Sequence, residues 1–179
     1  MPFKIIQLPR EREAEREQCF APFVVTEKAK FRYIAGKWSW KPVKEPGAWR
    51  KHYPIESNLD QLDHVVFLCM DGPVPAGQIT LCKWWNHFVY VDRLDVSPDY
   101  HRKGVGTLLL QTAREWARDQ GSRGLYLETQ DINIPAMRLY EKNGFTLCGI
   151  DTMFYYNTPH RGETAAFYYL LFDGEISMR

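Results

Sequence analysis

The stretch from Leu94 to Thr107, LDVSPDYHRKGVGT, constrains the fold more than any other part of the chain. It begins as the end of an apolar run, breaks at residues 97–99, and passes through two glycines into an amphipathic segment. This order predicts a strand, a basic loop and the first turn of a helix. A helix N-terminus favours anions, because its first backbone N–H groups are free and its dipole is positive there. Gly104 and Gly106 lack a Cβ and let a ligand approach the backbone. We therefore expect a phosphate-bearing ligand at this stretch.

The bulk properties favour a single domain. The 179 residues are enough for a sizeable core, and we expect one domain over 1–179, with a less regular part at 1–60 and a ligand-binding core at 61–172. The net charge of +1 indicates neither a nucleic-acid partner nor a polybasic membrane patch. The sequence has no signal peptide and no apolar run of transmembrane length, so we expect a cytoplasmic protein.

The four cysteines form neither a CxxC pair nor a metal-ligand pattern. We predict buried thiols in a reducing compartment, and no metal site, from their wide spacing at Cys19, Cys69, Cys82 and Cys148.

Hydrophobic periodicity predicts antiparallel hairpins followed by alternating helices and strands. The expected strands cover 3–8, 22–25, 64–70, 74–83, 88–96, 124–129, 145–150 and 165–172, and the expected helices cover 104–120 and 134–142. The run 10–18 is polar all round, which is typical of a solvated helix or loop. Aromatic residues alternate with Lys, Gly and Pro over 31–53, which favours an ordered loop or short strands covering a groove. The fold class is therefore α+β, a mixed and mostly antiparallel sheet flanked by helices.

Two of these elements carry a predicted face. A period of two places Tyr90, Asp92, Leu94 and Val96 on one side of their strand. In the helix over 104–120, the expected buried stripe consists of Val105, Leu109, Ala113, Trp116 and Ala117.

Two familiar phosphate loops do not match the glycine stretch. A P-loop requires GxxxxGK[ST], and no Lys-Ser/Thr pair follows the glycines. A dinucleotide fingerprint requires GxGxxG, and Leu109 stands where the third glycine belongs. The segment His101-Arg102-Lys103-Gly104-Val105-Gly106 instead resembles the acetyl-CoA loop of the GNAT N-acetyltransferases, Gln/Arg-x-x-Gly-x-Gly/Ala, with His in the first position.

A second motif strengthens this resemblance. Asn133-x-x-Ala136-x-x-x-Tyr140-x-x-x-Gly144-Phe145 is similar to the later GNAT segment, in which the Asn contacts the pantetheine arm and the Tyr faces the CoA sulfur. The resemblance implies acetyl-CoA as cosubstrate and a GNAT-like fold. It implies cofactor binding by Leu94, Asp95, Val96, His101, Arg102, Lys103, Gly104, Val105, Gly106, Thr107, Asn133, Ala136 and Tyr140.

A narrower resemblance concerns the acceptor. The strings at 127–131 (LETQD) and 151–153 (DTM), with Pro22-Phe23 and Trp85-Asn86, look like those of streptothricin acetyltransferases. These enzymes acetylate an amine on the β-lysine moiety of streptothricin antibiotics. The resemblance implies resistance by acetylation, and we expect substrate-binding residues at Asp92, Glu128, Asp131, Asp151, Trp85 and Glu163.

The expected reaction assigns a role to three side chains. An alkyl amine with a solution pKa near ~10 arrives protonated and must lose a proton before it attacks a thioester. Asp92 and Glu128 are candidates for the base, and each has a salt bridge as its alternative, with Arg93 or Arg138 as the partner. Tyr140 is the candidate acid that protonates the departing thiolate, and core packing is its alternative.

Several alternatives stay open from the sequence. Asp131, Asp151 and Glu163 are equally compatible with turns or solvated charges, and Trp85 with core packing. The acceptor is a small-molecule amine by the resemblance, with another polyamine, an aminoglycoside or a protein amine as rivals. A CoA-binding regulator without catalysis is the hypothesis from another class. The sequence leaves the oligomeric state open, with a homodimer as one candidate.

Overall fold

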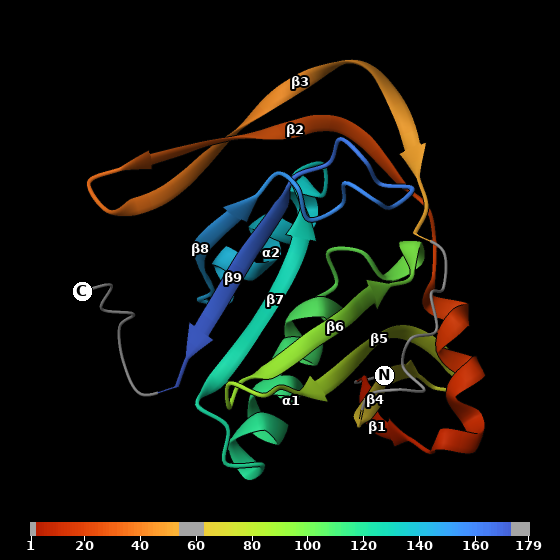
Figure 1. The fold of residues 1–179 in the computed structure, drawn as a ribbon. Helices are drawn as coiled ribbons and strands as arrows, with labels where there is room; N and C mark the ends of the chain where they lie inside the picture. Colours follow the sequence, from red (N-terminus) through yellow and green to blue (C-terminus); the bar gives the residue numbers. More distant parts are fainter. Residues whose placement is uncertain (1–2, 54–62, 173–179) are drawn as a thin grey trace. The chain divides into compact units, whose positions relative to one another are not determined.

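The computed structural model describes residues 3–53 and 63–172 of the chain (Figure 1). The chain divides into two compact units. Unit 1 consists of Met1–Pro22 and His52–Leu125, and unit 2 of Phe23–Lys51 and Tyr126–Arg179. Within the described ranges, no helix is long and apolar enough to cross a membrane.

Unit 1 contains a four-stranded antiparallel sheet. Its strands lie in the order β1 (Lys4–Leu8), β4 (His64–Asp71), β5 (Val74–Lys83) and β6 (Val89–Val96). The tight turn between β4 and β5 places Gly72 at a φ of +58°, as the predicted hairpin requires. The bounds of these strands differ by at most one residue from those that the periodicity predicts.

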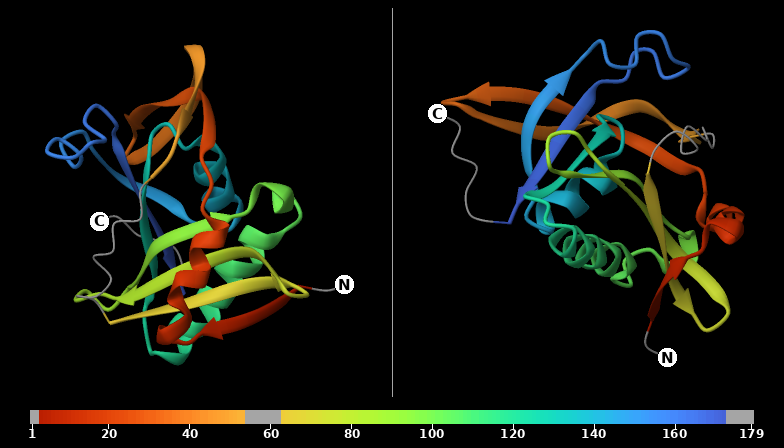
Figure 2. Two further views of the ribbon diagram at one scale, coloured as in Figure 1. Left: turned by 90° about the vertical axis from the view of Figure 1, so that its right-hand side faces the viewer. Right: turned by 60° about the horizontal axis from the view of Figure 1, so that its bottom comes forward.

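The helix α1 (Val105–Asp119) packs against β4, β5 and β6 of this sheet, and the two views of Figure 2 show it running beside the strands. Its contact with β5 depends on Gly77, because a Cβ there would lie 2.8 Å from both Val105 Cγ1 and the Asp95 carbonyl oxygen. Gly121, two residues beyond the end of the helix, has a φ of +69° and donates its N–H to the Arg118 carbonyl, which terminates the helix.

The buried stripe of α1 is confirmed with one exception. Val105, Leu109, Ala113 and Ala117 are fully buried, whereas Trp116 is only half-buried. Unit 1 also contains the short helix η3 (Pro98–Tyr100), which leads into α1, and the ten-residue 3-10 helix η1 (Arg10–Cys19).

The polar sequence of residues 10–18 indicated a helix or loop that is solvated on all sides. The helix η1 is instead partly buried. Arg16 and Cys19 are buried, with exposed fractions of 7% and 1%. Glu13 of η1 accepts a hydrogen bond of 2.8 Å from the His64 ring on β4. A polar helix therefore packs against the sheet along one face, where Glu13 pairs with His64, while residues 10–12, 14, 17 and 18 stay exposed.

A β-bulge in β6 overturns the predicted face of that strand. Val91 pairs with Leu81 and Arg93 with Thr80, so Asp92 is an extra residue without a partner opposite it. The bulge shifts the alternation by one residue. Consequently Tyr90 shares its face with Arg93 and Asp95, and Leu94 and Val96 lie on the other face, which faces α1.

Unit 2 combines strands, one helix and a long hairpin. The strands β7 (Gly124–Gln130), β9 (Ala165–Leu171) and β8 (Thr146–Asp151) are neighbours in that order, and β7 begins within unit 1. The helix α2 (Ile134–Lys142) has Asn133 as its N-cap, whose Oδ1 accepts the Ala136 N–H at 3.4 Å. Gly144, at a φ of +84°, ends this helix, as predicted.

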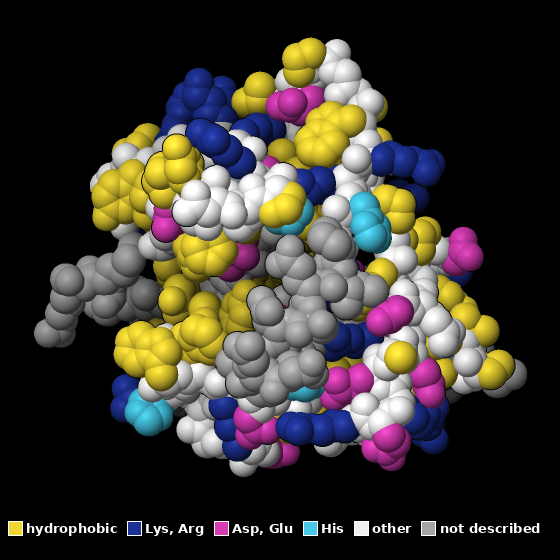
Figure 3. All heavy atoms as spheres, turned by 45° about the vertical axis from the view of Figure 1, so that its right-hand side comes forward, with side chains coloured by type: hydrophobic (Ala, Val, Ile, Leu, Met, Phe, Trp, Pro, Cys, Tyr) yellow, Lys and Arg dark blue, Asp and Glu magenta, His cyan; other side chains and the backbone are white. Residues whose placement is uncertain are grey.

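The hairpin of β2 (Phe23–Ile34) and β3 (Lys37–Lys51) is much longer than the short strands or loop expected for this region. A two-residue turn at Ala35-Gly36, with both φ angles positive, fixes its register. Phe31 lies opposite Trp40, and Tyr33 opposite Trp38, so the aromatic residues share one face. The pairing places Lys30, Arg32, Lys37 and Lys41 on the other face. Figure 3 shows Lys and Arg side chains at the upper left of that view.

The cysteines are all free, and three of the four are buried as predicted. Burial raises the pKa of the Cys69 thiol to about 11 and that of Cys82 to about 12. Cys148 is only partly buried, contrary to the prediction.

Candidate active site

The loop before α1 is anchored to the sheet of unit 1 by its first residues. Ser97 donates its N–H to the Ala76 carbonyl at 3.0 Å and its hydroxyl to the Pro75 carbonyl at 3.1 Å. The His101 ring contacts the Val96 carbonyl at 2.9 Å, and Nε2 must carry the proton because a carbonyl only accepts. This bond gives His101 a role within the loop.

The loop ends in a geometry that fits a phosphate group. Gly104 has a φ of +87°, and nothing lies within 4 Å of the position of a Cβ there. The first helical bond runs from the Leu108 N–H to the Gly104 carbonyl, so the N–H groups of Val105 and Gly106 precede it at the open end of the helix. Arg102 and Lys103 are exposed beside this end. Amides, dipole and cations together provide what the pyrophosphate of a nucleotide cosubstrate needs.

The bulge carboxylate of Asp92 lies among charged groups of unit 1. Its side chain is exposed, but the surrounding protein desolvates it and raises its pKa above the ordinary aspartate value. The charges of Arg16, Arg93 and His64 oppose this rise. Arg93, one of the two partners considered for a salt bridge with Asp92 or Glu128, forms an ion pair with Asp95, with Nε 2.8 Å from Oδ2.

A polar network that the sequence analysis missed lies beside the bulge. Gln78, fully buried, donates to Asp95 Oδ2 at 2.6 Å and accepts from the Thr80 hydroxyl at 3.0 Å. Arg93 completes the network and lies 3.9 Å from the centroid of the Phe20 ring. The sequence does contain a signal for this network. Gln78 and Thr80 are two residues apart in an otherwise apolar strand, so their side chains lie on the same face.

Unit 2 contains the second group of predicted residues. Tyr140 lies in the last turn of α2, is 7% exposed, and packs against the rings of Phe145 and Tyr168 with centroids 5.8 and 6.0 Å away. Glu128 is partly buried on β7, between buried neighbours. Arg138, its predicted alternative partner, lies 3.6 Å from Glu27 instead.

Two of the predicted substrate carboxylates are buried against lysines of the hairpin. Asp131, with an exposed fraction of 1%, lies 3.1 Å from Lys28 Nζ. Glu163 is 9% exposed and forms an ion pair with Lys51. Lysines of the chain itself therefore neutralise both carboxylates within unit 2.

The remaining predicted substrate residues are exposed. Asp151 accepts the Met153 N–H at 2.7 Å, which makes it a turn residue. The Trp85 side chain is 83% exposed in unit 1, so it does not pack in the core, whereas the adjacent Trp84 packs against Tyr90. Across the described part of the chain, no group of three or more His, Cys, Asp or Glu residues is arranged to hold a metal ion.

Residues 32–145, more than half of the chain, match the model of the acetyltransferase (GNAT) family. The chain belongs to the GNAT family. It is an acetyl-CoA-dependent N-acetyltransferase.

Known relatives of this GNAT acetyltransferase are similar along most of its length. Streptothricin acetyltransferase A of Bacillus subtilis is 35% identical over 155 residues, which cover 84% of this chain and 90% of the relative. A streptothricin acetyltransferase of Escherichia coli is 34% identical over 126 residues, covering 70% of this chain and 72% of the relative.

Solved structures confirm the predicted fold. A Bacillus anthracis protein described as a streptothricin acetyltransferase, in complex with acetyl coenzyme A, has a TM-score of 0.85 and 25% identity over 96% of this chain and all of that one. A nourseothricin acetyltransferase has a TM-score of 0.81 and 25% identity, covering 96% of this chain and 99% of that one.

Proposed function

We propose that this enzyme acetylates a primary amine of a small polycation, specifically the β-lysine moiety of streptothricin-type antibiotics, and so confers resistance to them. The observation that carries the proposal is the similarity to streptothricin acetyltransferase A over 84% of this chain and 90% of the relative. Other polyamines, aminoglycosides and protein amines are the competing acceptors.

The proposed reaction is direct attack in a ternary complex. The amine nitrogen forms a bond to the acetyl carbon while the carbon–sulfur bond breaks, and acetyl-CoA supplies the activated acetyl group. Asp92 or Glu128 takes the proton that the amine loses, directly or through water. A raised pKa suits Asp92 for this task, since it brings a carboxylate closer to the operating pH. Tyr140 holds a proton for the departing sulfur, and the β6 backbone at 94–96 donates to the acetyl carbonyl oxygen.

The acceptor's cationic groups require carboxylates and an accessible surface. Asp92, Asp151 and Trp85 have the accessibility this role needs, because all three are exposed. Asp131 and Glu163 already form ion pairs with Lys28 and Lys51. An ammonium group of the acceptor could bind to them only if it displaced those lysines. We therefore assign acceptor recognition first to Asp92, Glu128, Asp151 and Trp85, and to Asp131 and Glu163 only after such an exchange.

A thiol-release assay with an acceptor panel tests the proposal. The purified enzyme with acetyl-CoA is given streptothricin, an aminoglycoside, spermidine and a lysine-containing peptide at equal concentrations. We expect streptothricin to have the highest kcat/KM, with mass spectrometry placing one acetyl group on its β-lysine moiety. A higher kcat/KM for any other acceptor would replace the proposed substrate and leave the acetyltransferase assignment intact.

The role of Tyr140 is tested by Tyr140→Phe, with Tyr33→Phe at an exposed hairpin position as the matched control. Loss of the acid is expected to lower kcat by about 10²-fold or more while the dissociation constant of acetyl-CoA stays within about twofold. The control is expected to keep full activity. Unchanged kcat in Tyr140→Phe would reassign Tyr140 to packing against Phe145 and Tyr168.

A further inference from the structure

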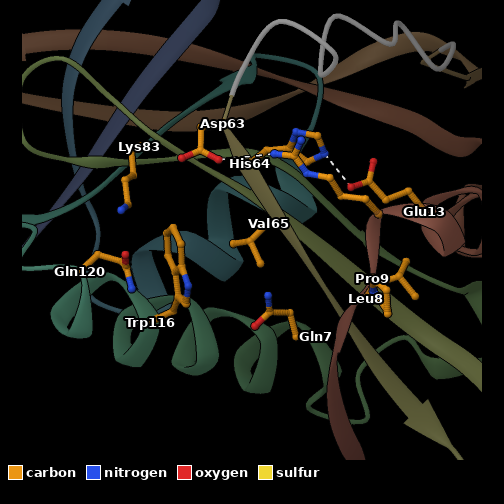
Figure 4. Close-up of a pocket in the computed structure, with 11 residues that line it drawn as sticks. Gln7, Leu8, Pro9, Glu13, Asp63, His64, Val65, Lys83, Trp116 and Gln120 are labelled. Carbon is orange, nitrogen blue, oxygen red and sulfur yellow. Dashed lines mark hydrogen bonds and ion pairs between the residues drawn. The ribbon is translucent and has the colours of Figure 1, made fainter.

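A pocket of about 300 Å³ opens in unit 1, at the opposite end of α1 from the loop that ends at Gly104. It lies among β1, η1, the start of β4, the end of β5 and the end of α1 (Figure 4). Trp116 on its wall is twelve residues beyond Gly104, which corresponds to ~18 Å along a helix. Its volume is at the lower end of the range for small-molecule sites.

The acidic side chains of this pocket already have partners. Glu13 binds His64, whose side chain is 4% exposed, and Asp63 binds Arg10 at 3.5 Å. The dashed lines of Figure 4 mark these two pairs at the upper edge of the hollow. A cationic ligand would have to displace Arg10 or His64 to reach a carboxylate here.

The donors on the opposite wall have no such partners. In the ranges that the structure describes, Lys83 forms no ion pair, and the Trp116 indole N–H and the amides of Gln7 and Gln120 form no side-chain hydrogen bond. Figure 4 shows Trp116 on α1 and Gln120 just after the end of this helix side by side, with Gln7 and Lys83 around the same hollow. Val65 and Leu8 add apolar surface to the wall.

We propose that this pocket binds a small carboxylic acid with a flat apolar or aromatic body. The carboxylate lies against the Lys83 ammonium and the Gln120 amide, which supply the charge-assisted hydrogen bonds that such a group prefers. The body of the ligand lies against the Trp116 ring and Val65. The site is separate from acetyl transfer and does not depend on which amine the enzyme acetylates.

Fluorine NMR on the full-length protein tests this site directly. The chain has six Trp residues, so 5-fluorotryptophan labelling gives a small set of signals, and Trp116→Phe identifies the one from Trp116. Phenylacetate is titrated as the probe, with phenylacetamide as its uncharged match and benzylamine as the cationic one. We expect phenylacetate to shift the Trp116 signal saturably, and phenylacetamide and benzylamine to bind at least about tenfold more weakly.

Variants assign the recognition to the wall residues. Lys83→Met and Gln120→Leu, both at exposed positions, are expected to weaken phenylacetate binding by ~10-fold and ~3-fold, because each removes a donor to the carboxylate. Arg123→Met, an exposed cation of unit 1 outside the wall, is the control and should leave binding unchanged. The proposal is overturned if phenylacetate leaves the Trp116 signal unmoved at ~10 mM, if phenylacetamide binds equally well, or if Lys83→Met matches the control.

Discussion

At the scale of single residues, the bulge at Asp92 distinguishes this carboxylate from its neighbours. Asp95, three positions on, is held by Gln78 and Arg93, whereas Asp92 has no residue opposite it on β5. Desolvation raises the pKa of Asp92, so its proton is lost at a higher pH than that of an ordinary aspartate, near ~3.9. A carboxylate in this state is a better proton acceptor than an ordinary aspartate, which suits Asp92 to the proposed role of base.

Asp92→Asn should therefore change the pH dependence of acetyl transfer. A base works only when deprotonated, so the activity of the native enzyme should fall as the pH drops through the raised pKa of Asp92. In the Asn variant we expect kcat to fall by about 10²-fold or more and this acid limb to disappear. The control is Asp119→Asn, an exposed carboxylate at the end of α1. A pH profile of kcat/KM with an intact acid limb in Asp92→Asn would move the role of the base to Glu128.

The sequence pointed to Asp92 but not to the bulge that sets its environment. A carboxylate within an apolar run is conspicuous, whereas a bulge depends on how the neighbouring strand is paired. The register of β5 against β6 places the extra residue at Asp92, and no local pattern in VYVDRLDV encodes that register. For the same reason the predicted face of Leu94 and Val96 was wrong relative to that of Tyr90.

At the scale of elements, Gly77 connects the sheet to the loop before α1, where we expect the phosphates of acetyl-CoA. A Cβ at this position would lie 2.8 Å from the Asp95 carbonyl and from Val105, at the first turn of α1. Gly77→Ala should push that turn away from β5, lower the free energy of unfolding by ~1–3 kcal/mol and raise the KM for acetyl-CoA. Urea unfolding and steady-state kinetics measure both effects. Gly47→Ala, where no atom lies within 4 Å, is the control, and equal effects in the two variants would contradict this account.

The β2–β3 hairpin offers a second matched pair of variants. Lys30 lies directly opposite Lys41, an unfavourable like-charge pair, whereas Lys44 lies opposite Glu27. Lys41→Glu should stabilise the protein by ~0.2–1 kcal/mol, and Lys44→Glu should destabilise it by a similar amount. Both replacements change the net charge equally, so a general charge effect would move the two free energies of unfolding in the same direction. Urea unfolding at low ionic strength separates these outcomes.

The hairpin also shows why the composition of a segment can mislead about its secondary structure. Alternating aromatic and basic residues form a period-two pattern, but the Gly and Pro residues among them favoured loops and short strands. Pro42 has no N–H to donate, and it lies opposite Ala29. The Ala29 N–H bonds to the Asp131 carbonyl at 2.7 Å instead of to β3, so the proline is tolerated at this position. That bond joins residues about a hundred positions apart in the sequence, so it leaves no local signal.

At the scale of the whole molecule, the acetyltransferase assignment followed from two short motifs, because each occurs in the local structure that its chemistry requires. The family match confirms that assignment and spans segments of both units. The ion pairs of Lys28 and Lys51 could not be predicted, since they depend on tertiary packing between distant segments.

The charge distribution, by contrast, can be read from the sequence. Residues 23–51 carry eight Lys and Arg against two Glu, in a chain whose net charge is +1.

This distribution predicts how the solubility of the enzyme depends on pH. With a pI near 7.7, the molecule has almost no net charge at neutral pH, so basic and acidic surfaces of different copies attract each other with little net repulsion. We expect a solubility minimum near that pI in low salt, relieved by ~0.15 M salt through screening.

Replacing both Lys30 and Lys41 with Glu lowers the net charge from +1 to −3 and should move the minimum to lower pH. Turbidity and light scattering across pH 5–9 measure the minimum, with Lys41→Arg as the charge-conserving control. A minimum that stays in place in the double variant would show that apolar contacts, not the charge of the hairpin, govern association.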